Sequence, residues 1–256
     1  MHQTAVVADD ARIGNDTTIG PYAVVESDVE IGPECSIGPH AVIGEGTRLG
    51  AGCRVFPGAC VGLIPQDLKF AGEKTRLYVG EKTTIRECVT INRGTQASGE
   101  TRVGSNCLLM AYSHVAHDCV VGDGVILANC AAVAGHVQIG DYAIVGGLVP
   151  IHQFTRIGAH AFLAAGARPF MDVVPFAMVG AEPTRIAGIN KVGLERRGFS
   201  AERRNAIGKA FRILFRKGLR LDQAAQTLQK RFPGNEDVAQ IAAFVSASSR
   251  GILRTS

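Results

Sequence analysis

A six-residue repeat constrains this chain more than any other feature of its sequence. Starting at Val7, every sixth residue as far as Val61 is aliphatic, and the residue two places before each is small in nearly all hexapeptides. The pattern resumes at Val79 and, after a second break, runs from Val103 to Leu163. Neither the 3.6-residue period of a helix nor the alternation of a simple strand fits this spacing. The repeat therefore predicts a parallel β-helix built from hexapeptides.

In such a fold each hexapeptide supplies one short strand and one turn. Three of them close a triangular coil of 18 residues, and the coils stack at the strand spacing of about 4.8 Å. The aliphatic residue fills the interior, and the small residue lets the chain bend at a corner. Four cysteines occupy this small position and are interpreted as structural, small apolar residues. These are Cys35, Cys53, Cys107 and Cys119.

Two segments interrupt the repeat, at 63–78 and 93–102, and both keep its register. We expect them to be loops that project from the coil, and loops on a rigid scaffold commonly carry function. Together with the repeats they define a predicted β-helix domain over 1–185.

The last part of the chain has a different pattern and a different charge. Ser200 is a predicted N-cap, a helical apolar side follows it as far as Gly218, and two further helical segments lie beyond. This predicts a helical domain over 190–256. From Asn190 onward there are 14 Lys and Arg against 5 Asp and Glu, a net of +9, whereas residues 1–189 carry 13 against 18, a net of −5. Such asymmetry indicates either an acidic partner for the tail or a solvated helical face.

Composition argues against several classes of protein. The formal net charge of +4 is too small to argue for nucleic-acid binding by itself. No apolar run is long enough to cross a bilayer as a helix, so no transmembrane helix is expected. The first residues lack the pattern of a signal peptide. Seven cysteines without a CxxC motif indicate reduced thiols and a cytoplasmic protein.

Polar residues recur at one corner of the predicted coil. Residues 18 apart occupy the same position on successive coils, so this spacing brings together side chains from three coils. His117, Gly135 and Gln153 share one position, Asp118 and His136 share the next, His152 precedes Gln153, and His114 lies half a hexapeptide earlier. Such a cluster predicts a functional site.

Two kinds of chemistry fit this cluster. Three converging imidazoles could hold a zinc ion, as in γ-class carbonic anhydrases, but no water-activating glutamate lies beside them. A general base fits better, because histidine exchanges protons near neutral pH. Asp118 could then fix the tautomer of His117, and the uncovered N–H of Gly135 could stabilise an oxyanion. We therefore expect a site without a metal ion.

Seven segments, in order along essentially the whole chain, resemble one enzyme family. They read "PQDLKFAGE", "IRECVTINRGT", "LLMAYSHVAHDC", "VAGHV", "GGLVPIHQF", "IGAHA" and "GLERRGFS". They are similar to those of the UDP-N-acetylglucosamine O-acyltransferases of lipid A biosynthesis. The resemblance implies a homotrimer of left-handed β-helices with active sites between subunits and no cofactor. The reaction it implies moves a 3-hydroxyacyl chain from acyl carrier protein to the 3-position of the sugar.

The resemblance also implies roles for individual residues. His117 would be the general base, Asp118 its support, and the Gly135 N–H the oxyanion donor. Asp67 would orient the sugar, while Lys69 and His114 would hold sugar or phosphate. Gln66, His136, His152 and Gln153 would line the site, Asn190, Arg196 and Arg197 would lie near the nucleotide, and Ala164 and Ala165 would limit acyl length. Acyl carrier protein is acidic, which would give the basic tail a partner.

Two positions depart from the family pattern. Many members have histidine at the place of Asn92, and many have an acid at the place of Val192. Some relatives accept a 3-amino sugar and form an amide, and Asn92 bears on that choice in our hypothesis. The rival interpretations are the N-acyltransferase of the same pathway or an acetyl-coenzyme A-dependent enzyme, a γ-class metalloenzyme, and a non-catalytic scaffold. The N-acyltransferase usually carries an extra N-terminal domain, whereas here the repeats begin by Val7.

Overall fold

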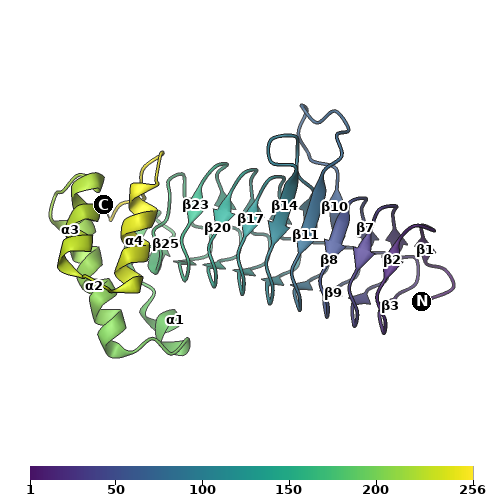
Figure 1. Cartoon of the computed structure of the whole chain (residues 1–256), viewed down its shortest axis with the longest axis horizontal. Helices are drawn as coiled ribbons and strands as arrows, with labels where there is room; N and C mark the ends of the chain where they lie inside the picture. The colour runs from purple at the N-terminus through teal and green to yellow at the C-terminus, as the bar shows by residue number, and fades with distance from the viewer. Residues whose placement is uncertain (256) are drawn as a thin grey trace.

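Short parallel strands wind into successive coils along one axis, and helices lie at the C-terminal end of the stack (Figure 1). The computed structural model describes residues 1–255. Strands from every third hexapeptide pair with one another, so the coils form three parallel sheets. The fold is the predicted left-handed parallel β-helix followed by a helical region.

The three sheets are named A, B and C in the order in which each coil visits them. Sheet A contains β1 (Val6–Val7), β4 (Val24–Val25), β7 (Val42–Ile43), β10 (Cys60–Leu63), β13 (Thr90–Asn92), β16 (His114–Val115), β19 (Ala132–Val133) and β22 (Pro150–Ile151). Sheet B contains β2 (Arg12–Ile13), β5 (Glu30–Ile31), β8 (Thr47–Leu49), β11 (Arg76–Val79), β14 (Glu100–Val103), β17 (Val120–Val121), β20 (Gln138–Ile139) and β23 (Arg156–Ile157). Sheet C contains β3 (Thr18–Ile19), β6 (Ser36–Ile37), β9 (Arg54–Val55), β12 (Thr84–Ile85), β15 (Leu108–Leu109), β18 (Ile126–Leu127), β21 (Ile144–Val145), β24 (Phe162–Leu163), β25 (Ala177–Gly180) and β26 (Arg185–Ile189).

Each hexapeptide ends in a turn whose conformation explains the repeat. The repeated aliphatic residue is buried inside the coil, as at Ile43 and Leu109. The residue three places later has a positive φ, for example +61° at His136. Its N–H donates to a carbonyl of the preceding coil, and the His136 N to His117 O distance is 3.1 Å. The residue before it is proline in several N-terminal coils, such as Pro39, because its N–H makes no bond in the stack.

Both loops leave the coil at the corner between sheets A and B. Val61 pairs with Ile91 across the first loop, and Val79 pairs with Val103 across the second. The first step is therefore two hexapeptides longer than a plain coil, and the second is one hexapeptide longer. The loops span 64–75 and 93–99, shorter than the predicted segments, because residues 76–78 and 100–102 extend strands β11 and β14. Figure 1 shows both loops projecting from the same side of the coil.

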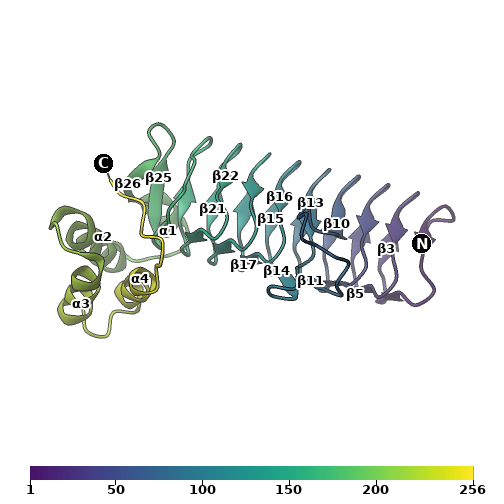
Figure 2. The ribbon, with the colours of Figure 1, turned by 90° about the horizontal axis from the view of Figure 1, so that it is seen from above.

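Within residues 1–255, four helices follow the coils, at the end of the stack opposite the N-terminus (Figure 2). They are α1 (Lys191–Arg196), α2 (Ala201–Arg216), α3 (Leu221–Arg231) and α4 (Glu236–Ser246). The three longer helices lie where the sequence predicted them, and the Ser200 hydroxyl caps α2 by accepting from the Arg203 N–H. Helix α1 and the antiparallel β25–β26 pair were not predicted, because elements this short carry too little periodicity. No helix among the described residues has the length and apolar composition needed to cross a bilayer. The division into domains at 1–185 and 190–256 stays a prediction.

Aromatic rings stack along the corner between sheets B and C, next to the helical region. The His160 ring lies 5.1 Å from that of Tyr142 and 5.6 Å from that of Phe176, measured between ring centroids. Burial, and then the positive charge of Arg197, lower the pKa of His160. Its Nδ1 atom is buried and has no hydrogen-bond partner within residues 1–255. The neutral ring is therefore the form that this fold accommodates.

We expect the stability of the protein to fall on acidification, partly through His160. Because its folded pKa is below the unfolded value near 6.5, the unfolded state binds the proton first as the pH falls. His160→Phe keeps the ring stack and should reduce the loss of unfolding free energy between pH 7.5 and 5.5. The change should be up to about 1 kcal/mol, since the ring is only partly buried.

Urea unfolding of both proteins at the two pH values measures this effect. His2→Phe is the control, because His2 is exposed. The same loss in wild type and His160→Phe would contradict the assignment.

Candidate active site

The corner between sheets A and B carries the predicted cluster, in the three coils that follow the two loops. His117, Gly135 and Gln153 occupy the same turn position on successive coils, as the 18-residue spacing predicts. The Phe154 N to Gly135 O distance of 3.2 Å repeats the bond that His136 makes to His117 one coil earlier. The loops 64–75 and 93–99 replace this same turn in the two preceding coils. Loops and cluster therefore form one continuous edge.

His117 and Asp118 form a hydrogen-bonded pair at this edge. The distance from His117 Nδ1 to Asp118 Oδ2 is 2.7 Å. The Asp118 side chain is fully buried, whereas 16% of the His117 side chain is exposed. With Nδ1–H donating to the carboxylate, Nε2 is left as the basic nitrogen. The pair therefore has the arrangement of a general base with an orienting carboxylate.

The 93–99 loop holds the Asp118 carboxylate in place. Oδ1 accepts from the Thr95 N–H at 2.9 Å and from the Ser98 hydroxyl, and Oδ2 accepts from the Thr95 hydroxyl at 2.6 Å. The Asp118 N–H in turn donates to Thr101 Oγ1 at 2.9 Å. Burial acts to raise the pKa of Asp118, but the bonds from Ser98, Thr95 and His117 outweigh it and hold the pKa well below its usual range. Asp118 is therefore ionised whenever His117 works as a base.

Reasoning from the sequence did not find Thr95, Ser98 or Thr101. The available signal was a hydroxyl-rich insertion, "RGTQASGET", in the coil just before His117. Period and register place this loop at the right corner, but they do not determine which of its hydroxyls turn toward Asp118.

Gly135 lies directly against the His117 ring. A Cβ atom at this position would stand 2.7 Å from His117 Cε1 and 2.9 Å from Nε2, which is closer than van der Waals contact. The Gly135 N–H donates no hydrogen bond within residues 1–255, as expected for a turn position that accepts proline elsewhere. A free backbone donor beside an imidazole suits the oxyanion of an acyl-transfer reaction.

Gly135→Ala should impair catalysis while leaving the coil intact. The added methyl group has to push the His117 ring away from its position, and displacements of about 1 Å can cost about 10²-fold in rate. We expect kcat for the reaction proposed below to fall by roughly 10- to 100-fold.

Gly147→Ala is the matched control, because Gly147 has the same turn position at another corner and its Cβ would meet only Asn129 O, at 3.3 Å. Equal kcat values in both variants would contradict the contact argument. Thermal unfolding of each variant separates misfolding from displacement of the ring.

Three further histidines belong to this edge to different degrees. His114 is hydrogen-bonded through Nδ1 to Thr90 Oγ1 at 2.7 Å. Burial, and then the charge of His117, lower the pKa of His114, which favours its neutral form. His136 approaches the dyad most closely, with Nε2 3.7 Å from Asp118 Oδ2. His152 and Gln153 are exposed at the next coil, where His152 Nδ1 donates to the Gln153 carbonyl at 3.0 Å.

The predicted sugar-binding residues Gln66, Asp67 and Lys69 lie on the 64–75 loop. The Asp67 carboxylate accepts from the Lys69 N–H at 3.0 Å, and the Gln66 and Lys69 side chains are exposed. No hydrogen bond or ion pair joins these three residues to His117 within residues 1–255. The structure therefore places them on the same edge as the dyad, with side chains free for a ligand.

Hydrogen bonds link the 64–75 loop to the 93–99 loop and to the strand that precedes it. Glu73 accepts from the Gln96 N–H at 3.1 Å, and the Asn92 amide donates to the Ile64 carbonyl at 2.9 Å. The loop that carries Asp67 is thus linked to the loop that holds Asp118.

The remaining predicted residues lie at other corners. Asn190 is buried, where Oδ1 caps α1 by accepting from the Gly193 N–H at 3.1 Å and Nδ2 donates to the His160 carbonyl at 3.0 Å. The Arg197 guanidinium lies 4.2 Å above the Tyr142 ring, at the corner between sheets B and C. Arg196 is exposed at the end of α1, and Ala164 and Ala165 occupy the turn after β24, at the corner between sheets C and A. One chain therefore does not bring these residues to His117.

His117, Asp118 and His136 also form a possible metal-binding group, since their ligand atoms lie within 4.8 Å of one another. Both Asp118 oxygens, however, already accept hydrogen bonds from the 93–99 loop. A zinc site needs at least three ligands turned toward the ion at about 2.0–2.3 Å. The geometry of these residues fits proton transfer better than metal coordination.

Comparison with known proteins gives consistent results along the whole chain. The family model described as UDP-N-acetylglucosamine O-acyltransferase, domain 2, matches residues 172–253. The model of the bacterial transferase hexapeptide matches residues 10–45, 25–57 and 100–135.

Several proteins resemble the chain over its full length. An acyl-[acyl-carrier-protein]–UDP-N-acetylglucosamine O-acyltransferase from Thiobacillus denitrificans is 49% identical over 255 residues, 99% of each protein. The protein of the same name from Verminephrobacter eiseniae is also 49% identical, over 99% of each. The crystal structure of a UDP-N-acetylglucosamine acyltransferase from Bacteroides fragilis superimposes with a TM-score of 0.96 at 41% identity, covering 99% of this chain and 100% of that one. That of a UDP-N-acetylglucosamine O-acyltransferase from Moraxella catarrhalis gives 0.96 at 38% identity, with 99% of each covered.

Proposed function

Because this chain belongs to the acyl-[acyl-carrier-protein]–UDP-N-acetylglucosamine O-acyltransferase family, we propose that it transfers a 3-hydroxyacyl chain from acyl carrier protein to UDP-N-acetylglucosamine. The acceptor is the 3-hydroxyl of the sugar, and the reaction is the first step of lipid A biosynthesis. The observation that carries the proposal is the His117–Asp118 pair packed against the free N–H of Gly135.

In this proposal His117 Nε2 removes the proton from the 3-hydroxyl while the oxygen attacks the thioester carbonyl. The tetrahedral oxyanion accepts a hydrogen bond from the Gly135 N–H. Collapse of the intermediate breaks the carbon–sulfur bond, and the His117 imidazolium returns the proton to the departing sulfur. Asp118 stabilises the imidazolium between these two steps. The reaction uses side-chain and backbone groups alone, so the proposal assigns no role to a metal ion or cofactor.

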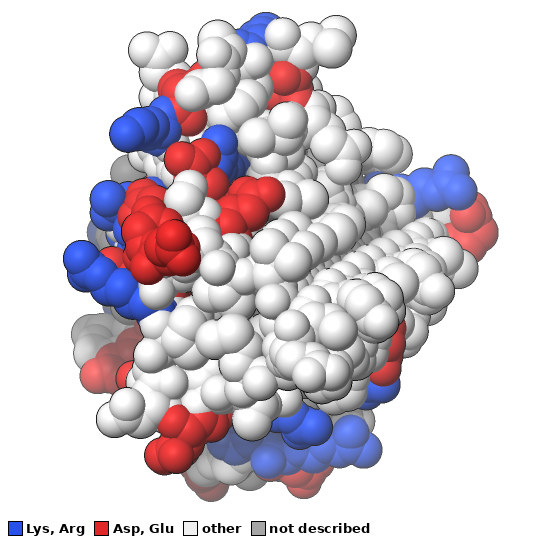
Figure 3. Space-filling view, turned by 90° about the vertical axis from the view of Figure 1, so that its right-hand side faces the viewer, with Lys and Arg blue, Asp and Glu red and all other residues white. Residues whose placement is uncertain are grey.

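The proposed enzyme is a homotrimer with active sites between neighbouring copies. Four outward-facing residues of sheet C are large and apolar, whereas most of those of sheet B are charged or polar. The sheet C residues are Leu108, Ile126, Ile144 and Phe162, and those of sheet B include Arg12, Glu30, Arg102 and Arg156. Figure 3, which looks along the coil axis, likewise shows charged side chains gathered over part of the surface and a broad uncharged flank. A second copy packed on sheet C would cover these apolar residues.

A neighbouring copy would also explain why the predicted ligand-binding residues are distributed over three corners. Asn190, Arg197 and Ala165 lie at other corners than His117, so in this proposal they would reach a ligand bound at His117 only from another copy. Sedimentation equilibrium should give about three times the chain mass of 27.0 kDa. A single-chain mass at micromolar concentration would contradict this part of the proposal.

We place the enzyme in the cytoplasm, where acyl carrier protein and nucleotide sugars occur together. All seven cysteines are free, including the exposed Cys88 and Cys130, which suits a reducing compartment.

The direct test uses the purified protein, UDP-N-acetylglucosamine and a series of 3-hydroxyacyl carrier proteins of increasing chain length. We expect a singly acylated sugar nucleotide, detected by mass, with one preferred length set in part by Ala164 and Ala165. Absence of product with every donor would contradict the proposed acceptor.

A second candidate acceptor is the corresponding 3-amino sugar, and one observation favours it. Asn92 lies one coil from Ala116, the neighbour of His117, and its Oδ1 atom is buried without a hydrogen-bond partner within residues 1–255. An attacking amine that gives one proton to His117 keeps another N–H for this oxygen, whereas a hydroxyl has only one proton. We expect Asn92→His to shift preference toward the 3-hydroxyl sugar in a competition assay. If Asn92→His and the wild type preferred the same sugar to the same extent, Asn92 would not determine the choice of acceptor.

A further inference from the structure

The segment that follows α4 returns to the coils and packs on the end of the stack. Ile252 and Leu253 are buried, and Ile252 forms a parallel bridge with Asp172. The Asp172 N–H donates to the Gly251 carbonyl at 3.1 Å, and the Asp172 carbonyl accepts from the Leu253 N–H at 2.8 Å. Figure 2 shows this segment, in yellow, running from α4 toward β26. We refer to residues 247–255 as the C-terminal segment.

A side chain of the C-terminal segment occupies a place where the stack of coils ends. At the corner between sheets A and B, the carbonyls of His117 and Gly135 each accept from the turn N–H of the next coil. No backbone N–H within residues 1–255 donates to the Gln153 carbonyl, because the N–H of Asp172 bonds to the C-terminal segment instead. The Arg250 guanidinium donates to the Gln153 carbonyl. Arg250 therefore takes the place of the next turn at the end of this edge.

The backbone beside Arg250 is held at the same corner by a buried carboxylate. Asp172 is buried, and its carboxylate accepts from the Ser248 hydroxyl at 2.8 Å and from the Arg156 N–H at 2.9 Å. The Arg254 carbonyl also accepts from the N–H of Ile186, at 2.8 Å. The C-terminal segment is thus fixed to the coils on both sides of Arg250, which is itself half-buried.

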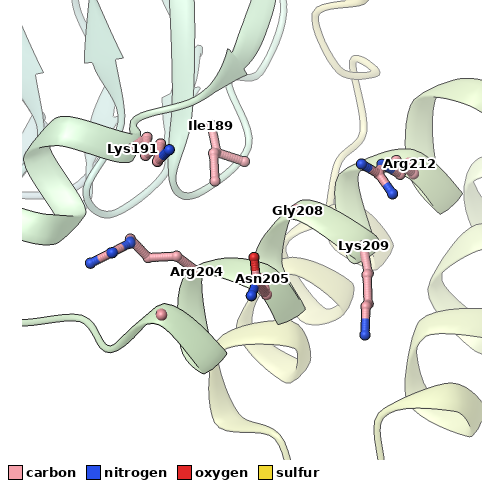
Figure 4. Close-up of a pocket in the computed structure, with 8 residues that line it drawn as sticks. Ile189, Lys191, Arg204, Asn205, Gly208, Lys209 and Arg212 are labelled. Atoms are coloured by element: carbon pink, nitrogen blue, oxygen red, sulfur yellow. The ribbon is translucent and has the colours of Figure 1, made fainter.

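Arg250 differs in its placement from the other cations of the helical region. Among residues 190–255, only the Arg250 side chain hydrogen-bonds to a turn of the corner that carries the site. Several of the others line a pocket beside β26, as Figure 4 shows for Lys191, Arg204, Lys209 and Arg212. The contact of Arg250 therefore does not follow from the general basic charge of this region.

The turn that Arg250 contacts carries two predicted ligand-binding side chains. His152 Nδ1 donates to the same Gln153 carbonyl at 3.0 Å, which leaves its Nε2 atom as an acceptor for a ligand. On the other side, the Phe154 N–H ties the turn to the Gly135 carbonyl at 3.2 Å. Without Arg250 the turn would therefore loosen at its outer side, where His152 and Gln153 lie, while its link to the preceding coil remained.

We propose that Arg250 is a positioning residue of the acyl-transfer site. By holding the Gln153 carbonyl, it fixes the directions in which the His152 and Gln153 side chains meet the acceptor sugar nucleotide. This inference rests on the proposed function, which supplies that ligand. The C-terminal segment would then complete the third coil of the site, although it follows Gln153 by almost a hundred residues in the sequence.

The test replaces Arg250 with methionine, which keeps an unbranched side chain and removes the guanidinium. KM for UDP-N-acetylglucosamine should rise by about tenfold, the effect of losing one hydrogen bond from a charged donor. The change in kcat should be smaller, within about threefold, because His117 and Gly135 keep their own partners. Arg254→Met is the matched control. Arg254 lies in the same segment and carries the same charge, but its exposed side chain makes no hydrogen bond or ion pair within residues 1–255.

Amide hydrogen exchange provides a second measurement that does not depend on activity. The Phe154 and Thr155 N–H groups should exchange at least about threefold faster in Arg250→Met than in the wild type, and at the wild-type rate in Arg254→Met. An unchanged KM in folded Arg250→Met, or the same rise in Arg254→Met, would overturn the proposal. If the wild type transfers no acyl group, the proposed function fails, and the exchange rates then decide whether Arg250 holds the turn. Equal rates in the wild type and Arg250→Met would show that it does not.

Discussion

Replacing His117 with alanine is expected to reduce kcat for acyl transfer by about 10²- to 10⁴-fold, the range over which a general base contributes. Among the described residues of the edge, only this ring combines a buried carboxylate partner, at 2.7 Å, with partial exposure. It also contacts Gly135, whose N–H is free. Without the imidazole the 3-hydroxyl has no base, although bound substrates keep their orientation. KM should therefore change much less than kcat.

The His117→Ala protein should remain folded, because the turn position of His117 tolerates proline, glycine and other residues in the remaining coils. Circular dichroism and sedimentation establish whether the coils and the assembly persist. His2→Ala, which removes an exposed imidazole far along the chain, is the control and should retain full activity. A folded His117→Ala protein with more than about a tenth of wild-type kcat would rule out His117 as the base.

Asp118→Asn is expected to cost about 10²- to 10⁴-fold in kcat, with almost no change in shape. Both carboxylate oxygens accept bonds from donors, Oδ1 from Thr95 and Ser98 and Oδ2 from Thr95 and His117. Whichever way an amide is placed, its NH₂ group therefore faces a donor. If it faces His117, Nδ1 becomes an acceptor and the proton moves to Nε2, where it blocks the base; this wrong tautomer costs up to about 10⁴-fold in serine-protease triads. Unfolding free energy should also fall, by about 1–3 kcal/mol, for a buried donor left without a partner.

Ser98→Ala separates these effects, because it removes one support of the carboxylate and leaves its charge. We expect a smaller loss of kcat than in Asp118→Asn, because the charged carboxylate still bonds to Thr95 and His117. Loss of the Ser98 bond raises the pKa of Asp118 toward its usual range, yet the carboxylate stays ionised at the pH at which His117 acts as a base. If Asp118→Asn and wild type share the same kcat, the carboxylate does not orient His117.

Much of the architecture was predictable because, in a fold with a six-residue period, the residue number determines the position of each residue on the coil. The aliphatic positions, the three-sheet cross-section and the stacking of Gly135 over His117 all follow from counting residues. The same counting assigns the two loops to the site-bearing corner, once the coil is known to restart in register.

What the period could not supply was the conformation of segments that lie outside it. The hydroxyls of Thr95 and Ser98 reach Asp118 through a loop with no repeat. Asn190 illustrates a different limit: its amide forms the cap of a helix too short to predict, so its contact with a nucleotide stays a prediction. The repeat of one chain also does not show which residues a second copy would supply to the site.

Because both loops are inserted at a single corner, a change in loop length has a different effect on the fold from an insertion within a coil. A loop that leaves and re-enters at the same turn can gain, lose or exchange residues without rotating any later coil, provided that β11 and β14 stay paired with their neighbours. A single-residue insertion between Val103 and Leu163, in contrast, has no loop to take it up, so it would have to form a local bulge or turn interior side chains of that hexapeptide toward solvent. The two loops can therefore change in length while the base, its carboxylate and the oxyanion donor keep one fixed spacing, provided that Thr95 and Ser98 still reach Asp118.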